Sequence, residues 1–399
     1  MPETNEKTAP RQLTVHHRGR MGQLGIYFGK MLRMFVYQSD WKVLPMAALI
    51  AGLVGMVIRN MLCISMEGTF MACFAMVMVC VWNGCFNSIQ VICRERDVIK
   101  REHRSGMHIS TYVASHMLYQ SILCLMQTGV TLYITQVVGV QYPEQGLFTP
   151  WMIVDIGISM FLITYASDMM SLWISCLARN TTTAMTIMPF ILIFQLVFSG
   201  GMLSLPSWTK PLSNLTISNP GIKVLTAQCD YNSLPMTALW NKVVGIWYEP
   251  VSTTVTLGQA MDFLQNDKKL PEVEELRQKK FSELLPETGD AEVDQSLLSL
   301  FKDSTVGELI DSIAEDPVVQ QNRDESYTIN TTIGRIISLI GTDKVQHYLL
   351  YEVAASSANP DYVLSRSNVA GYWIRLIGFT FLFAALSTVT LEFIDKDKR

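Results

Sequence analysis

Several stretches of this chain are apolar over about 18 residues or more, a length that marks membrane helices. Only 17% of the residues are charged and 49% are apolar, whereas soluble domains average about 25% charged residues. In hydrocarbon a lone segment satisfies its backbone hydrogen bonds only as a helix. We therefore predict an all-α, polytopic membrane protein with six transmembrane helices, at about residues 43–58, 69–92, 112–138, 151–177, 186–203 and 372–393.

The strongest basic run lies between the second and third predicted spans, in residues 93–115. Lys and Arg within about 15–20 residues of membrane spans mark a cytoplasmic loop. Acidic residues alternate with the basic ones here, and a patch built for anionic lipids would carry one sign of charge. The pattern favours a protein partner, with an unpartnered cytoplasmic loop as the alternative. Its candidate contact residues are Arg94, Glu95, Arg96, Lys100, Arg101, Glu102 and Gly106.

With that loop inside, the alternation of six spans places both termini in the cytoplasm, as expected for a multi-pass protein of the cell membrane. Residues 1–20 are polar and predict a flexible cytoplasmic tail. Residues 21–38 carry apolar side chains at helical spacing and predict an amphipathic interfacial helix in contact with membrane lipids. The remaining predicted segments are spans one to five in 39–203, with the loop at 93–111, an extracytoplasmic domain in 204–371, and span six with a cytoplasmic tail in 372–399.

The extracytoplasmic domain is predicted to be mainly helical. Thr256, Thr305 and Thr332 each stand before an apolar-periodic run, and the first two fit a capping box with Gln or Glu three residues later. Further helices are expected at about 272–285 and 343–355. The charged faces of these helices are interpreted as solvated surface, with binding of a ligand or partner as the alternative.

Motifs for catalysis are missing from the sequence. It contains no Gly-x-x-x-x-Gly-Lys-Ser/Thr loop, so any ATP and Mg²⁺ would be held by a partner chain. No zinc spacing of Cys and His occurs, and the basic run is too short and too mixed in charge for nucleic acid. We expect no catalytic, cofactor or metal site in this chain and no nucleic-acid partner.

Polar residues inside predicted spans are the remaining candidates for function, because hydrocarbon penalises them unless they face a protein interior or a cavity. Asn83 and Asn87 are one helical turn apart in the second span, so they share a face. Hydrogen bonding between helices is the alternative to a cargo path. The candidate cavity residues are Asn83, Phe86, Asn87, Phe194 and Gln195, and Asp168 is an intramembrane charge with either a structural or a proton or substrate role.

Two motifs resemble a known family. Residues 95–102, ERDVIKRE, followed by Ser105-Gly106-Met107 and Tyr112, are similar to the loop after the second span in the membrane domains of ABC-2 type transporters, in particular the G subfamily (White and pleiotropic drug resistance). Residues 189–202 and Pro206-Ser207-Trp208 are similar to the fifth span of these permeases and its exit. The resemblance implies that the loop docks on an ABC ATPase subunit. It also implies that spans two and five of two permease chains, identical or related, line the substrate cavity.

The function expected from these observations is the permease subunit of an ATP-driven ABC exporter, with no enzymatic activity of its own. One alternative is a membrane-anchored extracytoplasmic binding or sensor protein without transport activity. The other is an intramembrane enzyme that uses Asp155 and Asp168. These two residues lie thirteen positions apart, which is about 20 Å along a helix, too far to share a proton.

Overall fold

The computed structural model describes residues 19–37, 40–201, 206, 208–266, 271–280 and 304–393. They form two compact units. Unit 1 takes the described residues of Met1–Ser233 and Asn359–Arg399, and unit 2 takes those of Leu234–Ala358. Unit 2 is therefore shorter than the domain expected at 204–371. The expected tail, apart from residues 19 and 20, and the last six residues lie outside the described part.

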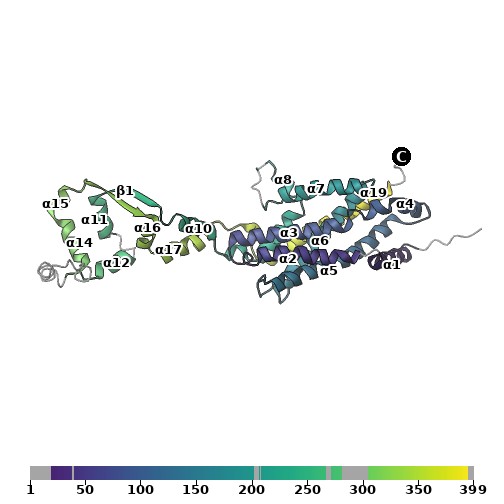
Figure 1. Ribbon diagram of the computed structural model, residues 1–399, viewed down its shortest axis with the longest axis horizontal. Coiled ribbons are helices and arrows are strands. Elements are labelled where there is room, and N and C mark those ends of the chain that lie inside the picture. Colours follow the sequence, from purple (N-terminus) through teal and green to yellow (C-terminus); the bar gives the residue numbers. More distant parts are fainter. Residues whose placement is uncertain are drawn as a thin grey trace, which may run out of the picture. The chain divides into compact units, whose positions relative to one another are not determined.

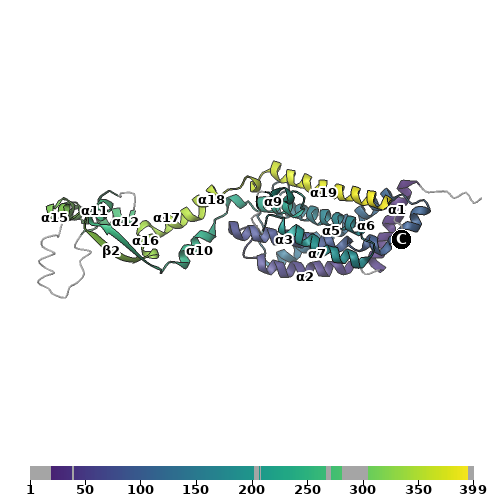
Figure 2. The same ribbon diagram turned by 90° about the horizontal axis from the view of Figure 1, so that it is seen from above.

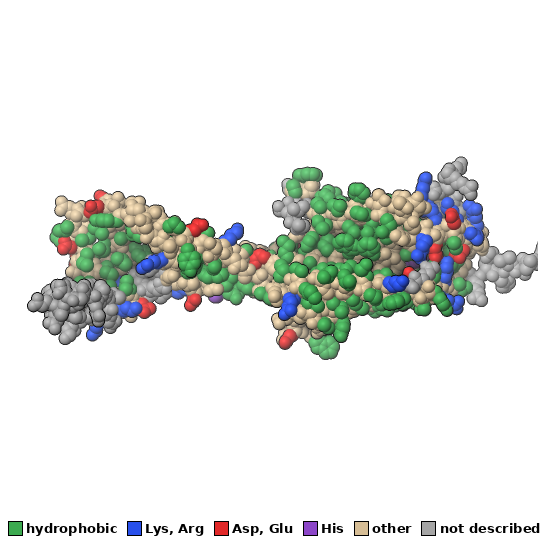
Figure 3. Space-filling model, in the orientation of Figure 1, with side chains coloured by type: hydrophobic (Ala, Val, Ile, Leu, Met, Phe, Trp, Pro, Cys, Tyr) green, Lys and Arg blue, Asp and Glu red, His purple; other side chains and the backbone are tan. Residues whose placement is uncertain are grey.

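Unit 1 is a bundle of long helices that run alongside one another (Figures 1 and 2). Figure 3 shows apolar side chains covering its flank. Its elements are α1 (Arg20–Tyr37), η1 (Asp40–Lys42), α2 (Val43–Ile58), α3 (Met66–Ser88), α4 (Val91–Arg104), α5 (Ile109–Val138), α6 (Met152–Leu177), α7 (Thr181–Val197), α8 (Lys210–Ser213), α9 (Ser218–Gln228), η2 (Tyr231–Ser233), η5 (Pro360–Tyr362) and α19 (Arg366–Glu392).

Within the described residues, five helical segments are long and apolar enough to cross a membrane. They contain α2, α3, α5, α6 and α19, and they match five of the six predicted spans. The predicted fifth span overlaps α7, an apolar helix of 17 residues that includes Pro189. The prediction differs most at the basic run, which is not a loop: α4 follows α3 almost directly, and α5 already begins at Ile109.

The core of unit 1 is built on close contact between α3 and α6. A Cβ added to Gly84 of α3 would lie 2.2 Å from the carbonyl oxygen of Thr164 on α6, so a larger residue would force the helices apart. α9 packs against α3, α6 and α19, and all of its residues except Lys223 are buried. This burial corrects the assignment of residues 218–228 to the outer domain: α9 belongs to the bundle.

The described residues of unit 2 are mostly helical but include one antiparallel ribbon, which was not predicted from the sequence. The ribbon pairs β1 (Pro250–Thr256) with β2 (Ser326–Thr332), in a register from Pro250 opposite Thr332 to Thr256 opposite Ser326. Both strands are rich in Thr and other β-branched residues, which favour strands. The other elements are α10 (Thr237–Gly245), α11 (Leu257–Asn266), α12 (Pro271–Gln278), α14 (Val306–Glu315), α15 (Pro317–Gln321), α16 (Ile333–Ile340), α17 (Thr342–His347), the π-helical turn η4 (Tyr348–Glu352) and α18 (Val353–Ser356).

The three predicted helix starts in unit 2 are confirmed. Thr305 and Glu308 form a complete capping box at the start of α14. The hydroxyl of Thr256 accepts a hydrogen bond from the backbone N–H of Gln259 before α11, and that of Thr332 accepts one from Arg335 before α16. The expected helix at 343–355 corresponds to α17, η4 and α18. Of the expected helix at 272–285, residues 272–278 are helical among the described residues, within α12.

Candidate functional site

α4 is the surface helix that carries the predicted contact residues. It presents a stripe of exposed residues at helical spacing, whereas Ile92, Cys93 and Ile99 on the opposite face are buried. The helix joins two membrane-spanning segments. Basic side chains gather at the end of unit 1 that carries α4 and α1 (Figure 3). The exposed stripe consists of Arg94, Asp97, Val98, Arg101 and Arg104, and Ser105, which directly follows α4, is exposed as well.

α4 and α6 cap each other. The hydroxyl of Ser175, near the end of α6, accepts hydrogen bonds from the backbone N–H groups of Ile92 (3.1 Å) and Cys93 (3.2 Å) in the first turn of α4. In return, the Arg96 guanidinium donates to the carbonyl oxygens of Cys176 (3.0 Å) and Ala178 (2.9 Å) where α6 ends. Helix ends leave backbone groups without intrahelical partners. These contacts satisfy several of them and fix α4 to α6.

α1 holds α4 from another side. The Lys30 ammonium lies 3.4 Å from a carboxylate oxygen of Glu95 and 3.9 Å from one of Glu102. The Gln23 side chain donates to the carbonyl of Gly106 (3.1 Å) and accepts from the N–H of His108 (3.0 Å), at the turn between α4 and α5. Gly106 has φ +100°, a conformation that L side chains rarely adopt, so this turn requires glycine.

The pKa of Tyr27 on α1 is raised to about 12 by burial and then by the negative charge of Glu102. The phenol is therefore neutral at physiological pH and can donate a hydrogen bond to that carboxylate. α1 thus contacts α4 through a neutral phenol as well as through the Lys30 ammonium.

The seven predicted contact residues fall into two groups. Arg94, Arg101 and Gly106 are exposed, whereas Glu95, Arg96, Lys100 and Glu102 are partly buried. Three of the second group, Glu95, Arg96 and Glu102, make the internal contacts described above. Asp97 and Arg104 also lie on the exposed face, although the prediction did not include them. Their spacing of three or four residues from Arg101 is the sequence signal that could have identified them.

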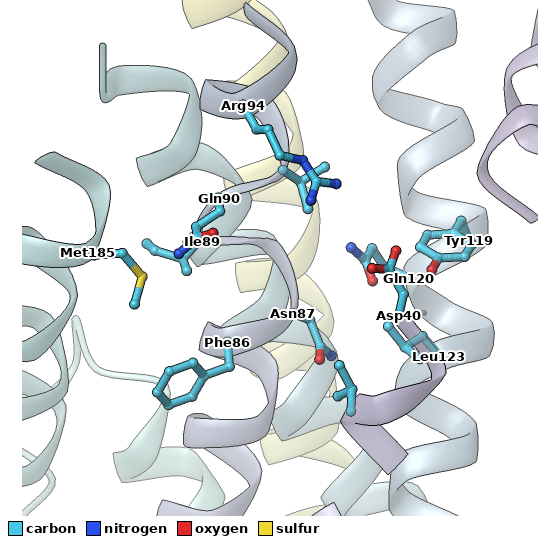
Figure 4. Close-up of a pocket in the computed structure, with 12 residues that line it drawn as sticks. Asp40, Phe86, Asn87, Ile89, Gln90, Arg94, Tyr119, Gln120, Leu123 and Met185 are labelled. Atoms are coloured by element: carbon cyan, nitrogen blue, oxygen red, sulfur yellow. The ribbon is translucent and has the colours of Figure 1, made fainter. Parts of the chain in front are cut away.

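A cavity of about 220 Å³ opens where α2, α3, α4, α5 and α7 approach one another. Figure 4 shows Phe86 leaving α3 on the side of Met185, and Asn87 leaving it on the side of Gln120 and Leu123. The lining of the cavity includes one acidic and one basic residue, Asp40 and Arg94. It therefore offers an amide, an aromatic ring and charged groups in one space.

A second cavity of about 450 Å³ lies against α2, α3 and α5. Its lining residues include Asn83 and Phe86, and Phe86 stacks on Trp82 with the ring centroids 6.2 Å apart. Trp82 and Phe86 are 48% and 46% exposed, so α3 presents an aromatic surface outside the core of unit 1.

The structure brings Asn83, Phe86 and Asn87 to these two cavities, whereas neither cavity is lined by Phe194 or Gln195. Gln195 is buried, and its side-chain oxygen accepts hydrogen bonds from the N–H groups of Ile217 (2.9 Å) and Ser218 (3.1 Å). It holds the start of α9. Phe194 packs on Phe198 with the ring centroids 4.9 Å apart.

Asp168 lies at the centre of a buried polar network that ties α3, α5 and α6. Ser88 of α3 donates a hydrogen bond to its carboxylate, Gln120 donates to the Ser88 hydroxyl (2.7 Å), and Cys124 of α5 donates to the carboxylate at 3.5 Å. One turn away, the amides of Asn87 and Gln127 exchange two hydrogen bonds of 2.8 and 3.0 Å. Both sets of contacts join helices, and the role of Asp168 beyond them stays a prediction.

Asp155 has a structural role at the other end of α6. Its carboxylate accepts hydrogen bonds from three consecutive backbone N–H groups, those of Leu147 (2.7 Å), Phe148 (2.8 Å) and Thr149 (3.2 Å). It fixes the connection between α5 and α6. Because this carboxylate is fully engaged, a catalytic pair of Asp155 with Asp168 finds no support in the geometry. Within the described ranges, no cluster of three or more His, Cys, Asp or Glu could hold a metal ion.

The helical bundle, with its enclosed polar groups and apolar flank, defines a multi-pass membrane protein. Residues 25–225 match the family described as ABC-2 type transporter, and the chain belongs to this family. It is the membrane, permease part of an ABC transporter. The resemblance found in the sequence is thus confirmed for the family, and the assignment to the G subfamily stays a prediction.

One relative is the "ABC transporter ATP-binding/permease protein Rv1747" of Mycobacterium tuberculosis (strain ATCC 25618 / H37Rv). It is 24% identical over 189 residues, which cover 44% of this chain and 21% of that protein. The match therefore spans about a fifth of that relative's length.

Proposed function

We propose that this chain is the permease subunit of an ATP-driven exporter, and that a separate ABC ATPase docks on the exposed stripe of α4. The observation that carries the proposal is α4 itself, a surface helix between two spans that is fixed on its inner face and charged on its outer face. A force applied to such a helix passes to the bundle and is not absorbed by a flexible loop.

The reciprocal caps give this force a route. Movement of α4 would pull on α6 through Ser175 and Arg96, and on α1 through Lys30. α6 packs closely on α3, whose Phe86 and Asn87 border the 220 Å³ cavity. Docking and release of the ATPase would then alter the cavity. A lining of amides and aromatic rings suits a large amphipathic cargo better than an ion, which is usually met by rings of charge or carbonyls.

ATP and Mg²⁺ belong to the partner in this proposal, because the sequence has no phosphate-binding loop. The relative from Mycobacterium tuberculosis, which is named an ATP-binding/permease protein, supports such a partnership. We further propose that α7 completes a sixth span and that α4 and both termini face the cytoplasm of a cell membrane. A second permease chain, identical or related, would enclose the cargo path.

The alternative function, a membrane-anchored binding or sensor protein, draws support from unit 2, which is compact by itself. An anchor, however, has no need for a charged helix braced against two others. The two functions differ in whether an ATPase binds.

Charge reversal on the exposed stripe tests the proposal. Arg101→Glu combined with Arg104→Glu should abolish co-purification of the proposed ABC ATPase partner and its permease-stimulated ATP hydrolysis, while the chain remains inserted. Arg335→Glu, an exposed site on α16 of unit 2, is the matched control and should leave both unchanged. Retention of the ATPase by the double variant would refute docking on α4.

A further inference from the structure

Two adjoining cavities follow the junction of α5 and α6, away from the cavities beside α3. The first, of about 700 Å³, lies where α5 ends and α6 begins, and its lining includes Gln136, Gln141, Glu144 and Trp151. The second, of about 470 Å³, continues between the two helices and is lined mostly by apolar side chains. Gln136 and Ile153 line both cavities, so a polar pocket leads into an apolar groove.

The polar pocket offers hydrogen-bond acceptors and a negative charge. The side chains of Gln136, Gln141 and Glu144 are exposed, and within the described part of the chain none of them makes a hydrogen bond or an ion pair. Among the described lining residues, Glu144 is the only charged one. Carboxylate and amide oxygens accept hydrogen bonds. The pocket therefore suits a positively charged donor and disfavours an anion.

Internal contacts fix the walls of the polar pocket. The hydroxyls of Thr135 and Tyr142 share a hydrogen bond of 2.8 Å, and Trp151 pairs with Gln145 in an isolated β-bridge. The carboxylate of Asp155 holds the intervening backbone through the three N–H groups described above. A site held in one conformation loses less conformational entropy when a ligand binds. The pocket is thus preorganised.

Two glycines shape the apolar groove. A Cβ at Gly129 of α5 would meet no atom within 4 Å, so a side chain there would occupy the open groove. A Cβ at Gly157 of α6 would lie 2.9 Å from Cδ1 of Leu132, so the two helices approach closely at this point. Glycine is a poor residue for a helix interior. At Gly129 no close neighbour requires it, which favours a role for the space itself.

Aromatic residues mark the level of these cavities in the membrane. Tyr133 near the end of α5 and Trp151 just before α6 are both 67% exposed. Tyr and Trp concentrate where the hydrocarbon meets the headgroups. The polar pocket therefore lies at headgroup level, and the groove runs along two helices that are long and apolar enough to span the membrane. Lipid surrounds such helices, so an acyl chain can enter the groove from the side.

We propose that the pocket and the groove bind one membrane lipid with an ethanolamine headgroup. Its ammonium donates to Glu144 and to the amide oxygens of Gln136 and Gln141, while an acyl chain lies in the groove over Gly129. An ammonium group has three N–H donors. A choline headgroup carries none, and an anionic headgroup would bring negative charge to Glu144. With the orientation proposed above, the lipid belongs to the outer leaflet.

Native mass spectrometry of the purified, full-length chain tests the inference with three lipids of identical acyl chains: phosphatidylethanolamine, phosphatidylcholine and phosphatidylglycerol. The ethanolamine lipid should bind more tightly than both others, by about fivefold over phosphatidylglycerol, which corresponds to about 1 kcal/mol for an exposed ion pair. A different lipid that binds as tightly or more tightly would overturn the proposal. The assay needs no ATPase, so its outcome is independent of the proposed function.

A matched pair of glycine variants tests the groove. Gly129→Leu should abolish retention of the ethanolamine lipid, because the new side chain fills the space for the acyl chain. Gly378→Leu on α19 is the control, since Gly378 is also exposed and its Cβ would also meet no atom within 4 Å. Unchanged binding in Gly129→Leu, or an equal loss in both variants, would refute a site in this groove.

A second pair of variants tests the headgroup contact. Glu144→Gln should remove the preference for ethanolamine over glycerol headgroups, whereas Glu249→Gln, at an exposed position of unit 2, should retain it. Thermal unfolding without added lipid shows whether each variant is folded. If Gly129→Leu does not fold, the headgroup series and Glu144→Gln still decide. A preference that survives Glu144→Gln would remove the ammonium from this pocket.

Discussion

Two amides one helical turn apart on α3 meet different surroundings. Asn87 exchanges two hydrogen bonds with Gln127 of α5. Asn83 borders the 450 Å³ cavity, and among the described residues its side chain makes no hydrogen bond. The same residue type on one helix face therefore serves two purposes, one as a tie between helices and the other as a polar point on a cavity wall.

Replacing Asn87 by Leu should lower stability, because it removes both hydrogen bonds and leaves the Gln127 amide buried without its partner. We expect a loss of about 1–2 kcal/mol, above the roughly 0.6 kcal/mol average for interhelical bonds. The combined variant with Gln127→Leu should recover part of the loss. Unfolding of the purified chain in detergent measures the stability of the single and the double variant. An unchanged free energy of unfolding in Asn87→Leu would show that the hydrogen bonds to Gln127 do not stabilise the contact between α3 and α5.

Asn83→Leu is the matched cavity variant. It removes a polar group without breaking a hydrogen bond among the described residues, so unfolding should be unaffected. Cargo-stimulated ATP hydrolysis by the assembled transporter should change if this wall contacts cargo. A variant that lowers stability and leaves the cargo profile intact would remove Asn83 from the path.

Asp168 can be tested in the same way. Asn retains the size of the side chain and an oxygen that accepts from Ser88, so Asp168→Asn should keep stability within about 1 kcal/mol and retain transport. Asp168→Leu removes the acceptor for Ser88 and Cys124 and should cost about 1–3 kcal/mol. Normal unfolding with lost transport in the Asn variant would instead assign a proton or cargo role to this carboxylate.

Two arginines of α4 allow its attachment to α6 to be tested separately from its proposed contact with the ATPase. Arg96→Gln should remove the cap on α6 and lower stability by about 0.5–2 kcal/mol, the range for lost helix caps. Arg101→Gln changes an exposed position of the same helix and should leave stability unchanged while weakening the ATPase contact. Thermal unfolding and co-purification of the ATPase distinguish the two, and equal unfolding temperatures would show that the cap does not fix α4.

The spans were predictable because a lone segment in hydrocarbon satisfies its backbone hydrogen bonds only as a helix. The helix starts at Thr305 and Thr332 were predictable because a capping hydroxyl bonds to a backbone N–H within three residues. The structural role of Gln195 was not predictable, because the backbone N–H groups that donate to it lie 22 and 23 positions away in the sequence. The sequence also could not place α9, whose burial depends on α3, α6 and α19 together. The ribbon had a local signal in its β-branched residues, but the partner strands are too far apart in sequence for that signal to pair them.

For the whole molecule, the decisive question is which side of the membrane each part of the chain faces. The chain leaves unit 1 after η2 and returns at η5, where Tyr231 and Tyr362 pack against Phe70 near the start of α3. α4 follows the opposite end of α3. A helix that crosses the membrane places its two ends on opposite sides, so unit 2 and α4 should lie in different compartments.

Single cysteines report this arrangement directly. Thr253→Cys on β1 and Arg101→Cys on α4 both stand at exposed positions. With α4 in the cytoplasm, as its basic stripe favours, an impermeant maleimide added to intact cells should label position 253 and spare position 101, and permeabilised cells should show label at both. Peptide mapping distinguishes these sites from the partly exposed Cys63. Label at 101 but not at 253 in intact cells would invert the orientation and remove the ATPase from α4. Label at both positions in intact cells would show that α3 does not cross the membrane.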